Sequence, residues 1–170
     1  MNKKVEKTVF SALFLAAGMV LPLLTAQLKE LGDSLLPMHF AVLLCGFVCG
    51  PRHGLAVGLI LPFLRSVVFS APPIYPNALW MSLELATYGY VAGLLYTKSK
   101  KTLVSIYVAL IIAMFSGRVV WGVTKALLLG LGGNGFTPMA FIMGGFIDAL
   151  PGIIIQLITI PFLVKRRKMR

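Results

Sequence analysis

The chain has 170 residues, of which 58% are hydrophobic and 12% are charged, whereas soluble domains average about 25% charged residues. The mean hydropathy is +0.91, and a soluble fold of this size cannot hide so much apolar surface. The composition therefore excludes an ordinary soluble domain. It predicts a single transmembrane domain over residues 1–170.

The net charge is +11 at pH 7. The basic residues stand in short runs between apolar stretches, which is typical of membrane topology signals and not of a nucleic-acid surface. We therefore expect the lipid bilayer and no nucleic acid as a partner. The first apolar run, about residues 8–28, is longer than a signal-peptide core and ends without a convincing A-x-A site, so we expect an uncleaved helix.

Six apolar stretches follow one another along the chain. They cover about residues 8–28, 35–50, 54–70, 77–97, 102–129 and 138–164. A helix needs about 20 residues to cross the hydrocarbon core, so the second and third are short. They have the form of a hairpin split at residues 50–54, where proline removes a backbone donor and glycine permits the turn. The sequence predicts an all-α membrane protein, a bundle of six transmembrane helices.

The distribution of basic residues predicts the orientation of the bundle. With the N-terminus inside, the outer loops hold only Lys29. The cytoplasmic segments hold Lys3, Lys4, Lys7, Arg52, Lys98, Lys100, Lys101, Lys165, Arg166, Arg167, Lys168 and Arg170. This positive-inside bias predicts cytoplasmic N- and C-termini and an even number of crossings.

Charged residues inside a bilayer are expensive and usually face the bundle interior. Five stand in the apolar stretches: Arg65, Glu84, Arg118, Lys125 and Asp148. None lies near the cytoplasmic end of its predicted helix, so we expect a polar cavity on the outer side. Three positive groups against two negative ones favour an anionic ligand, such as a carboxylate.

Helical spacing groups these charges with aromatic residues. Positions i, i+3 and i+7 share a helix face, which joins Arg118, Trp121 and Lys125 on one helix and Asn77, Trp80 and Glu84 on another. Such groups suit a small-molecule site, in which tryptophans stack on a planar ligand. Two other interpretations stay open. The charges can be ion pairs that hold the bundle together, and the tryptophans can be interfacial belt residues.

His39 begins the second predicted helix near the outer surface, where it is a further candidate for ligand binding. No other histidine, cysteine or acidic residue is spaced to form a metal site with it. The HExxH, GxSxG and paired-carboxylate motifs are also absent from the sequence. We therefore expect no catalytic residue, metal or cofactor, and no intrinsic enzyme.

One segment carries a family resemblance. The stretch from Met38 to Gly54 runs Met-His, an apolar helix and Gly-Pro-Arg-His-Gly, and Gly58 follows. It resembles the second helix and following turn of the substrate-binding S components of energy-coupling factor (ECF) vitamin transporters. Ala12 and Ala16 match the AxxxA motif of that family. The branch that carries pantothenate, folate and hydroxymethylpyrimidine is the most similar.

The resemblance implies a mechanism and a location. An S component binds a vitamin or vitamin precursor at the outer side with high affinity. It then associates with a membrane coupling subunit and two cytoplasmic ATPases, which supply the energy. Ala12 and Ala16 would meet the coupling subunit, and the chain would lie in a bacterial plasma membrane.

Two other functions stay open on the sequence. One is a self-sufficient secondary transporter or channel, although that class often has inverted repeats, which we do not find. The other is a structural membrane subunit, in which the intramembrane charges are ion pairs and the small-residue faces serve partners.

Overall fold

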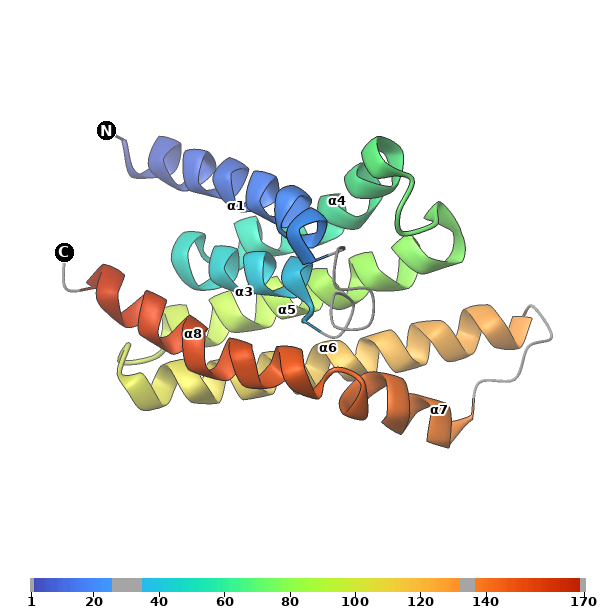
Figure 1. The fold of residues 1–170 in the computed structure, drawn as a ribbon. Coiled ribbons are helices and arrows are strands. Elements are labelled where there is room, and N and C mark those ends of the chain that lie inside the picture. The colour runs from blue at the N-terminus through green and yellow to red at the C-terminus, as the bar shows by residue number, and fades with distance from the viewer. Residues whose placement is uncertain (1, 26–34, 132–136, 169–170) are drawn as a thin grey trace.

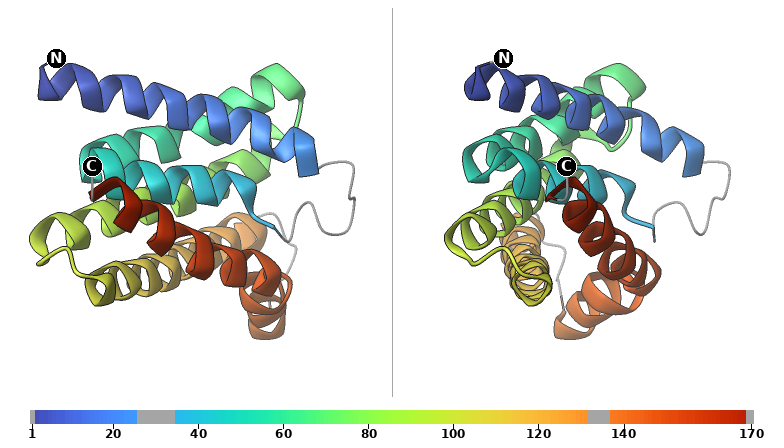
Figure 2. Two further views of the ribbon diagram at one scale, coloured as in Figure 1. Left: turned by 60° about the vertical axis from the view of Figure 1, so that its left-hand side comes forward. Right: turned by 90° about the vertical axis from the view of Figure 1, so that its left-hand side faces the viewer.

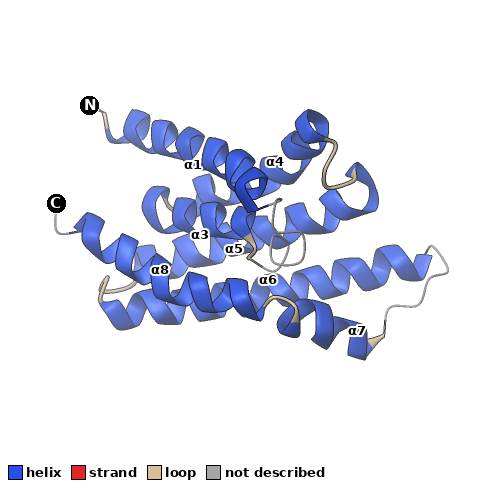
Figure 3. Ribbon diagram, viewed as in Figure 1, coloured by secondary structure: helices blue, strands red, loops and turns tan. Residues whose placement is uncertain are grey.

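The computed structural model describes residues 2–25, 35–131 and 137–168 of the chain. Within these ranges the chain forms helices and no strands, which confirms the all-α prediction (Figure 3). The elements in chain order are α1 (Lys3–Thr25), α3 (Pro37–Cys49), α4 (Pro51–Phe69), η1 (Ile74–Ala78), α5 (Leu79–Lys98), α6 (Leu103–Leu131), α7 (Pro138–Ile142), η2 (Met143–Ile147) and α8 (Leu150–Lys168). The predicted outer loops around residues 29–34 and 130–135 lie largely outside the described residues.

Three described helices are long and apolar enough to cross a membrane: α1, α4 and α6. A fourth span is possible if the segments Pro138–Ile147 and Leu150–Arg166, which meet at an angle of 40°, count as one crossing. Helix α3 is apolar but has only 13 residues, fewer than a full crossing needs. Six crossings therefore stay a prediction.

Two predicted boundaries were wrong. The turn predicted over residues 50–54 consists of Gly50 alone, with φ at +98°, a conformation that glycine adopts without steric cost. Pro51 already begins α4 at a position where its missing N–H costs nothing. The helix predicted over residues 138–164 is broken, because η2 ends and the chain bends before α8 begins.

Helix α3 forms the centre of the bundle. It contacts α1, α4, α5 and α8, and most of its residues from Met38 to Cys49 are buried (Figure 1). Figure 2 shows the helices running roughly side by side, with both chain ends at one end of the bundle. Placing both termini at one end fits the even number of crossings that the sequence predicts.

Glycine residues allow α3, α4 and α5 to touch through their backbones. A Cβ atom added at Gly46 would overlap the carbonyl group of Gly89, and one added at Gly89 would overlap the backbone of Gly54. Such contacts between small residues are how helices associate closely in lipid. Gly46, Gly54 and Gly89 therefore join α3, α4 and α5 by direct backbone contact.

Candidate functional site

Three buried polar side chains from three helices meet inside the bundle. Glu84 on α5 is 1% exposed, His39 on α3 is 4% exposed and Arg118 on α6 is 5% exposed. Arg118 Nη1 donates a hydrogen bond to Glu84 Oε1 at 2.9 Å. His39 Nε2 lies 3.3 Å from the same oxygen, without hydrogen-bond alignment. We call these three residues the charged cluster.

Local packing explains why these side chains reach one another. The Gly46–Gly89 contact draws α3 against α5, which brings His39 within reach of Glu84. The ring of Tyr88, one turn after Glu84, meets the His39 ring edge to face, with 5.2 Å between the ring centroids. That ring also lies against Gly117, where a Cβ atom would come within 3.0 Å of it. A larger residue at position 117 would therefore displace the ring next to Arg118.

A second group lies further along the same two helices. The Nζ atom of Lys125 lies 4.7 Å from the ring centroid of Trp121 and 5.3 Å from that of Trp80. A cation at this distance from an aromatic face is attracted by the ring quadrupole. Trp80 precedes Glu84 by one turn, and Trp121 follows Arg118 by about one turn. The tryptophan–lysine group therefore adjoins the charged cluster.

The broken segment of the chain lies against this second group. Phe141 of α7 stacks on Trp121, with the ring centroids 6.1 Å apart and the planes at 30°. A Cβ atom at Gly144 of η2 would come within 3.2 Å of the same indole. The close approach of η2 to Trp121 therefore depends on a residue without a side chain at position 144.

The structure brings together six of the nine predicted site residues: His39, Trp80, Glu84, Arg118, Trp121 and Lys125. Asn77 is half-buried in η1, three residues before Trp80.

Two predicted site residues lie elsewhere. Arg65 turns toward α1, where its Nη1 donates to the carbonyl oxygen of Met19 at 2.9 Å, and its guanidinium lies 5.5 Å from the ring centroid of Phe69. Asp148 is exposed at the bend after η2, so the expectation that it faces the bundle interior was wrong.

Gln156 is a buried polar residue that the sequence did not single out. It is 1% exposed, and its Nε2 donates to the carbonyl oxygen of Leu36, just before α3, at 3.4 Å. A lone amide in the apolar run of α8 is the signal in the sequence that marks this position. Gln156 therefore links α8 to Leu36, which lies three residues before His39.

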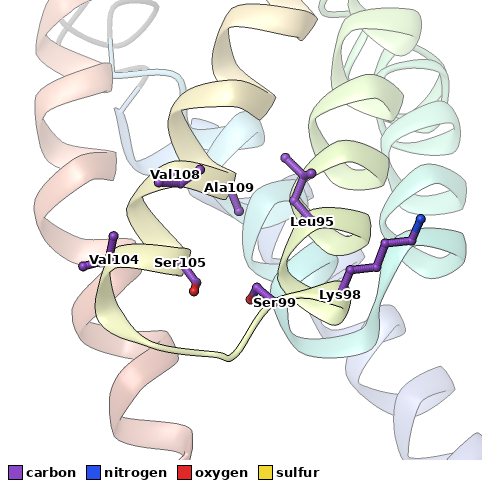
Figure 4. Close-up of a pocket in the computed structure, with 7 residues that line it drawn as sticks. All are labelled: Leu95, Lys98, Ser99, Val104, Ser105, Val108 and Ala109. Atoms are coloured by element: carbon purple, nitrogen blue, oxygen red, sulfur yellow. The ribbon is translucent and has the colours of Figure 1, made fainter.

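A cavity of about 290 Å³ opens between the end of α5 and the start of α6 (Figure 4). It is lined by Leu95, Lys98, Ser99, Val104, Ser105, Val108 and Ala109. None of the predicted site residues lines it. It lies at the end of the bundle where the chain termini also lie, away from the tryptophan–lysine group.

Comparison with protein families gives one result. A family model described as "ECF transporter, substrate-specific component" matches residues 6–164. The chain belongs to this family. Neither the comparison with curated proteins nor the comparison with solved structures gave a match. As an ECF substrate-specific component, the chain is a membrane protein and a substrate-binding subunit of a transporter, and such components are not enzymes.

Proposed function

We propose that this S component captures a vitamin or vitamin precursor at the charged cluster and the adjoining tryptophan–lysine group. It then delivers the ligand by associating with a coupling subunit and two ATPases. The observation that supports this most is the convergence of buried charges and both tryptophans of the chain on one part of the bundle. Apolar sites with a few convergent polar groups are typical of small-molecule binding.

The basic residues support an outer location for this site. Lys98, Lys100 and Lys101 lie at the α5–α6 connection, at the same end of the bundle as the termini. A positive-inside orientation makes this the cytoplasmic end. At a rise of about 1.5 Å per residue, Glu84 and Arg118 lie about 20 Å from it, beyond the middle of a hydrocarbon core of about 30 Å. The proposed topology is six crossings of the plasma membrane with both termini inside.

This function is tested by separating ligand binding by the chain from ATP-driven transport by the complete complex. Purified chain in liposomes should bind ligand but transport none, whether or not a proton or sodium gradient is applied. Liposomes that also contain the coupling subunit and the ATPases should take up ligand when ATP is supplied. Gradient-driven uptake by the chain alone would contradict the proposal and support a self-sufficient transporter, an alternative that the family membership does not favour.

The proposed docking face lies on α1. Ala12 and Ala16 are exposed, and neither side chain is needed for packing within the described bundle. Small exposed residues allow the backbone of a partner helix to approach closely in lipid. We propose that this face meets the coupling subunit.

Replacing either alanine with tryptophan should separate binding from transport. Ala12→Trp and Ala16→Trp should lower ATP-driven uptake at least tenfold, because the indole holds the partner helix away. Ligand affinity of the isolated chain should stay within twofold, because both residues are on α1, outside the candidate site. The matched control is Ala126→Trp, at an exposed alanine on α6, which should preserve uptake. An equal loss of binding in the α1 variants would contradict the assignment.

A further inference from the structure

Arg118 uses only part of its guanidinium group. Its Nη1 pairs with Glu84, while its Nε and Nη2 atoms are buried and have no hydrogen-bond partner among the described residues. Leaving N–H groups of a charged side chain buried and unpaired is costly. Arginine presents Nε–H and Nη2–H side by side, in the fork geometry that accepts a carboxylate with two parallel hydrogen bonds.

Charge at the candidate site points to the same kind of ligand. The charged cluster and the tryptophan–lysine group together hold two cations, Arg118 and Lys125, against one anion, Glu84, when His39 is neutral. Lys125 lies two turns beyond Arg118 on α6, about 10 Å along the helix axis. A monoanionic ligand would neutralise the surplus positive charge.

The neighbouring aromatic rings provide an apolar surface for the rest of the ligand. Trp121 lies on the α6 face between Arg118 and Lys125, and Trp80 lies opposite on α5. The guanidinium edge formed by Nε and Nη2 of Arg118 is buried. A ligand therefore reaches it only if nearby side chains or the α7–η2 segment move. Trp121 touches that segment through Phe141 and Gly144. Binding should therefore change the surroundings of the indoles.

We propose that the ligand of this chain carries a carboxylate, which binds side-on to Nε and Nη2 of Arg118 while its uncharged part lies against Trp121 and Trp80. This inference rests on the proposed capture function and names the chemical class of its ligand. Glu84 is then a positioning residue, because it holds Nη1 and so directs the opposite edge of the guanidinium toward the ligand.

Matched pairs of compounds test this inference on the purified full chain. The probes are pantothenate and pantothenol, nicotinate and nicotinamide, and biotin and biotin amide, with thiamine as a cationic probe. Affinity is measured by titration calorimetry. Tryptophan emission reports the place of binding, because the only 2 tryptophans of the chain both contact Lys125. We expect at least one carboxylate to bind, to shift the emission and to bind about 10- to 100-fold more tightly than its neutral partner.

A conservative variant tests the role of the arginine fork. Arg118→Lys keeps a positive charge for Glu84 but removes the paired N–H groups, so the preference for the carboxylate should fall at least tenfold. Arg65→Lys, at the other buried arginine on the described helices, should keep the preference. If Arg118→Lys fails to fold, the comparison of each carboxylate with its neutral partner on the unmodified chain still tests the inference.

Three results would overturn the inference. They are equal affinity for a carboxylate and its neutral partner, tight binding of thiamine with a shift in emission, and no binding of any carboxylate. Binding of neutral compounds or of thiamine would leave the capture function standing and reject only the anionic ligand. Failure of ATP-driven uptake with the complete transporter would instead reject the capture function itself.

Discussion

Replacing Glu84 with glutamine should destabilise the bundle strongly. Glutamine has nearly the same shape, but it leaves the guanidinium of Arg118 buried without its counter-charge. Removing one partner of a buried ion pair typically costs about 3–5 kcal/mol. Thermal unfolding of the detergent-solubilised chain measures the loss. The control is Asp148→Asn, which changes an exposed carboxylate and should leave the melting temperature nearly unchanged.

Exchanging the two charges separates the structural role of the pair from its role in binding. The double variant Glu84→Arg with Arg118→Glu should recover part of the lost stability, because the ion pair is restored with reversed polarity. Ligand binding should not recover, because the arginine and its paired N–H groups now lie on α5 and not on α6. Recovery of both stability and full affinity would indicate that the pair only holds the bundle together.

Replacing Gly89 with alanine should also damage the fold. The added methyl group would overlap the backbone of Gly54 on α4, and a backbone cannot rotate away as a flexible side chain can. Overpacking a well-packed interior typically costs about 1–3 kcal/mol, and occasionally more. Because Gly46 of α3 also contacts Gly89, the separation of α5 should move Glu84 away from His39. The melting temperature should therefore fall, and the affinity for the ligand should weaken.

A second glycine provides the matched control. Gly130, near the end of α6, has no neighbouring atom within 4 Å of an added Cβ. Alanine favours helix over glycine by about 0.5–1 kcal/mol, so Gly130→Ala should be neutral or slightly stabilising. A similar loss in both variants would show that helix propensity, and not the α4–α5 contact, determines the effect of Gly89→Ala.

The sequence predicted the helices well because their signal is local. Each of the six apolar stretches contains a helix within the described residues. The break in the last stretch was not predicted. Apolar residues continue on both sides of Asp148. The segment before the bend packs against Trp121, which lies more than twenty residues away in the sequence.

The site was predicted only in part, because the partner of a charge depends on helix rotation and tilt. The spacing of Arg118, Trp121 and Lys125 correctly placed them on one face of α6. It gave no means of choosing between Arg65 and Arg118 as the partner of Glu84. The structure pairs Glu84 with Arg118 and turns Arg65 to the Met19 carbonyl. Both contacts join residues more than thirty positions apart, which no local pattern encodes.

Capture of a small molecule by this chain alone is the core of the proposed function. Native mass spectrometry of gently purified protein tests it most directly. We expect the intact chain to carry an additional vitamin-sized mass, and Glu84→Gln protein that stays folded to carry much less of it. Protein that is consistently empty, and that no member of a vitamin panel stabilises against thermal unfolding, would contradict small-molecule capture and favour a structural subunit.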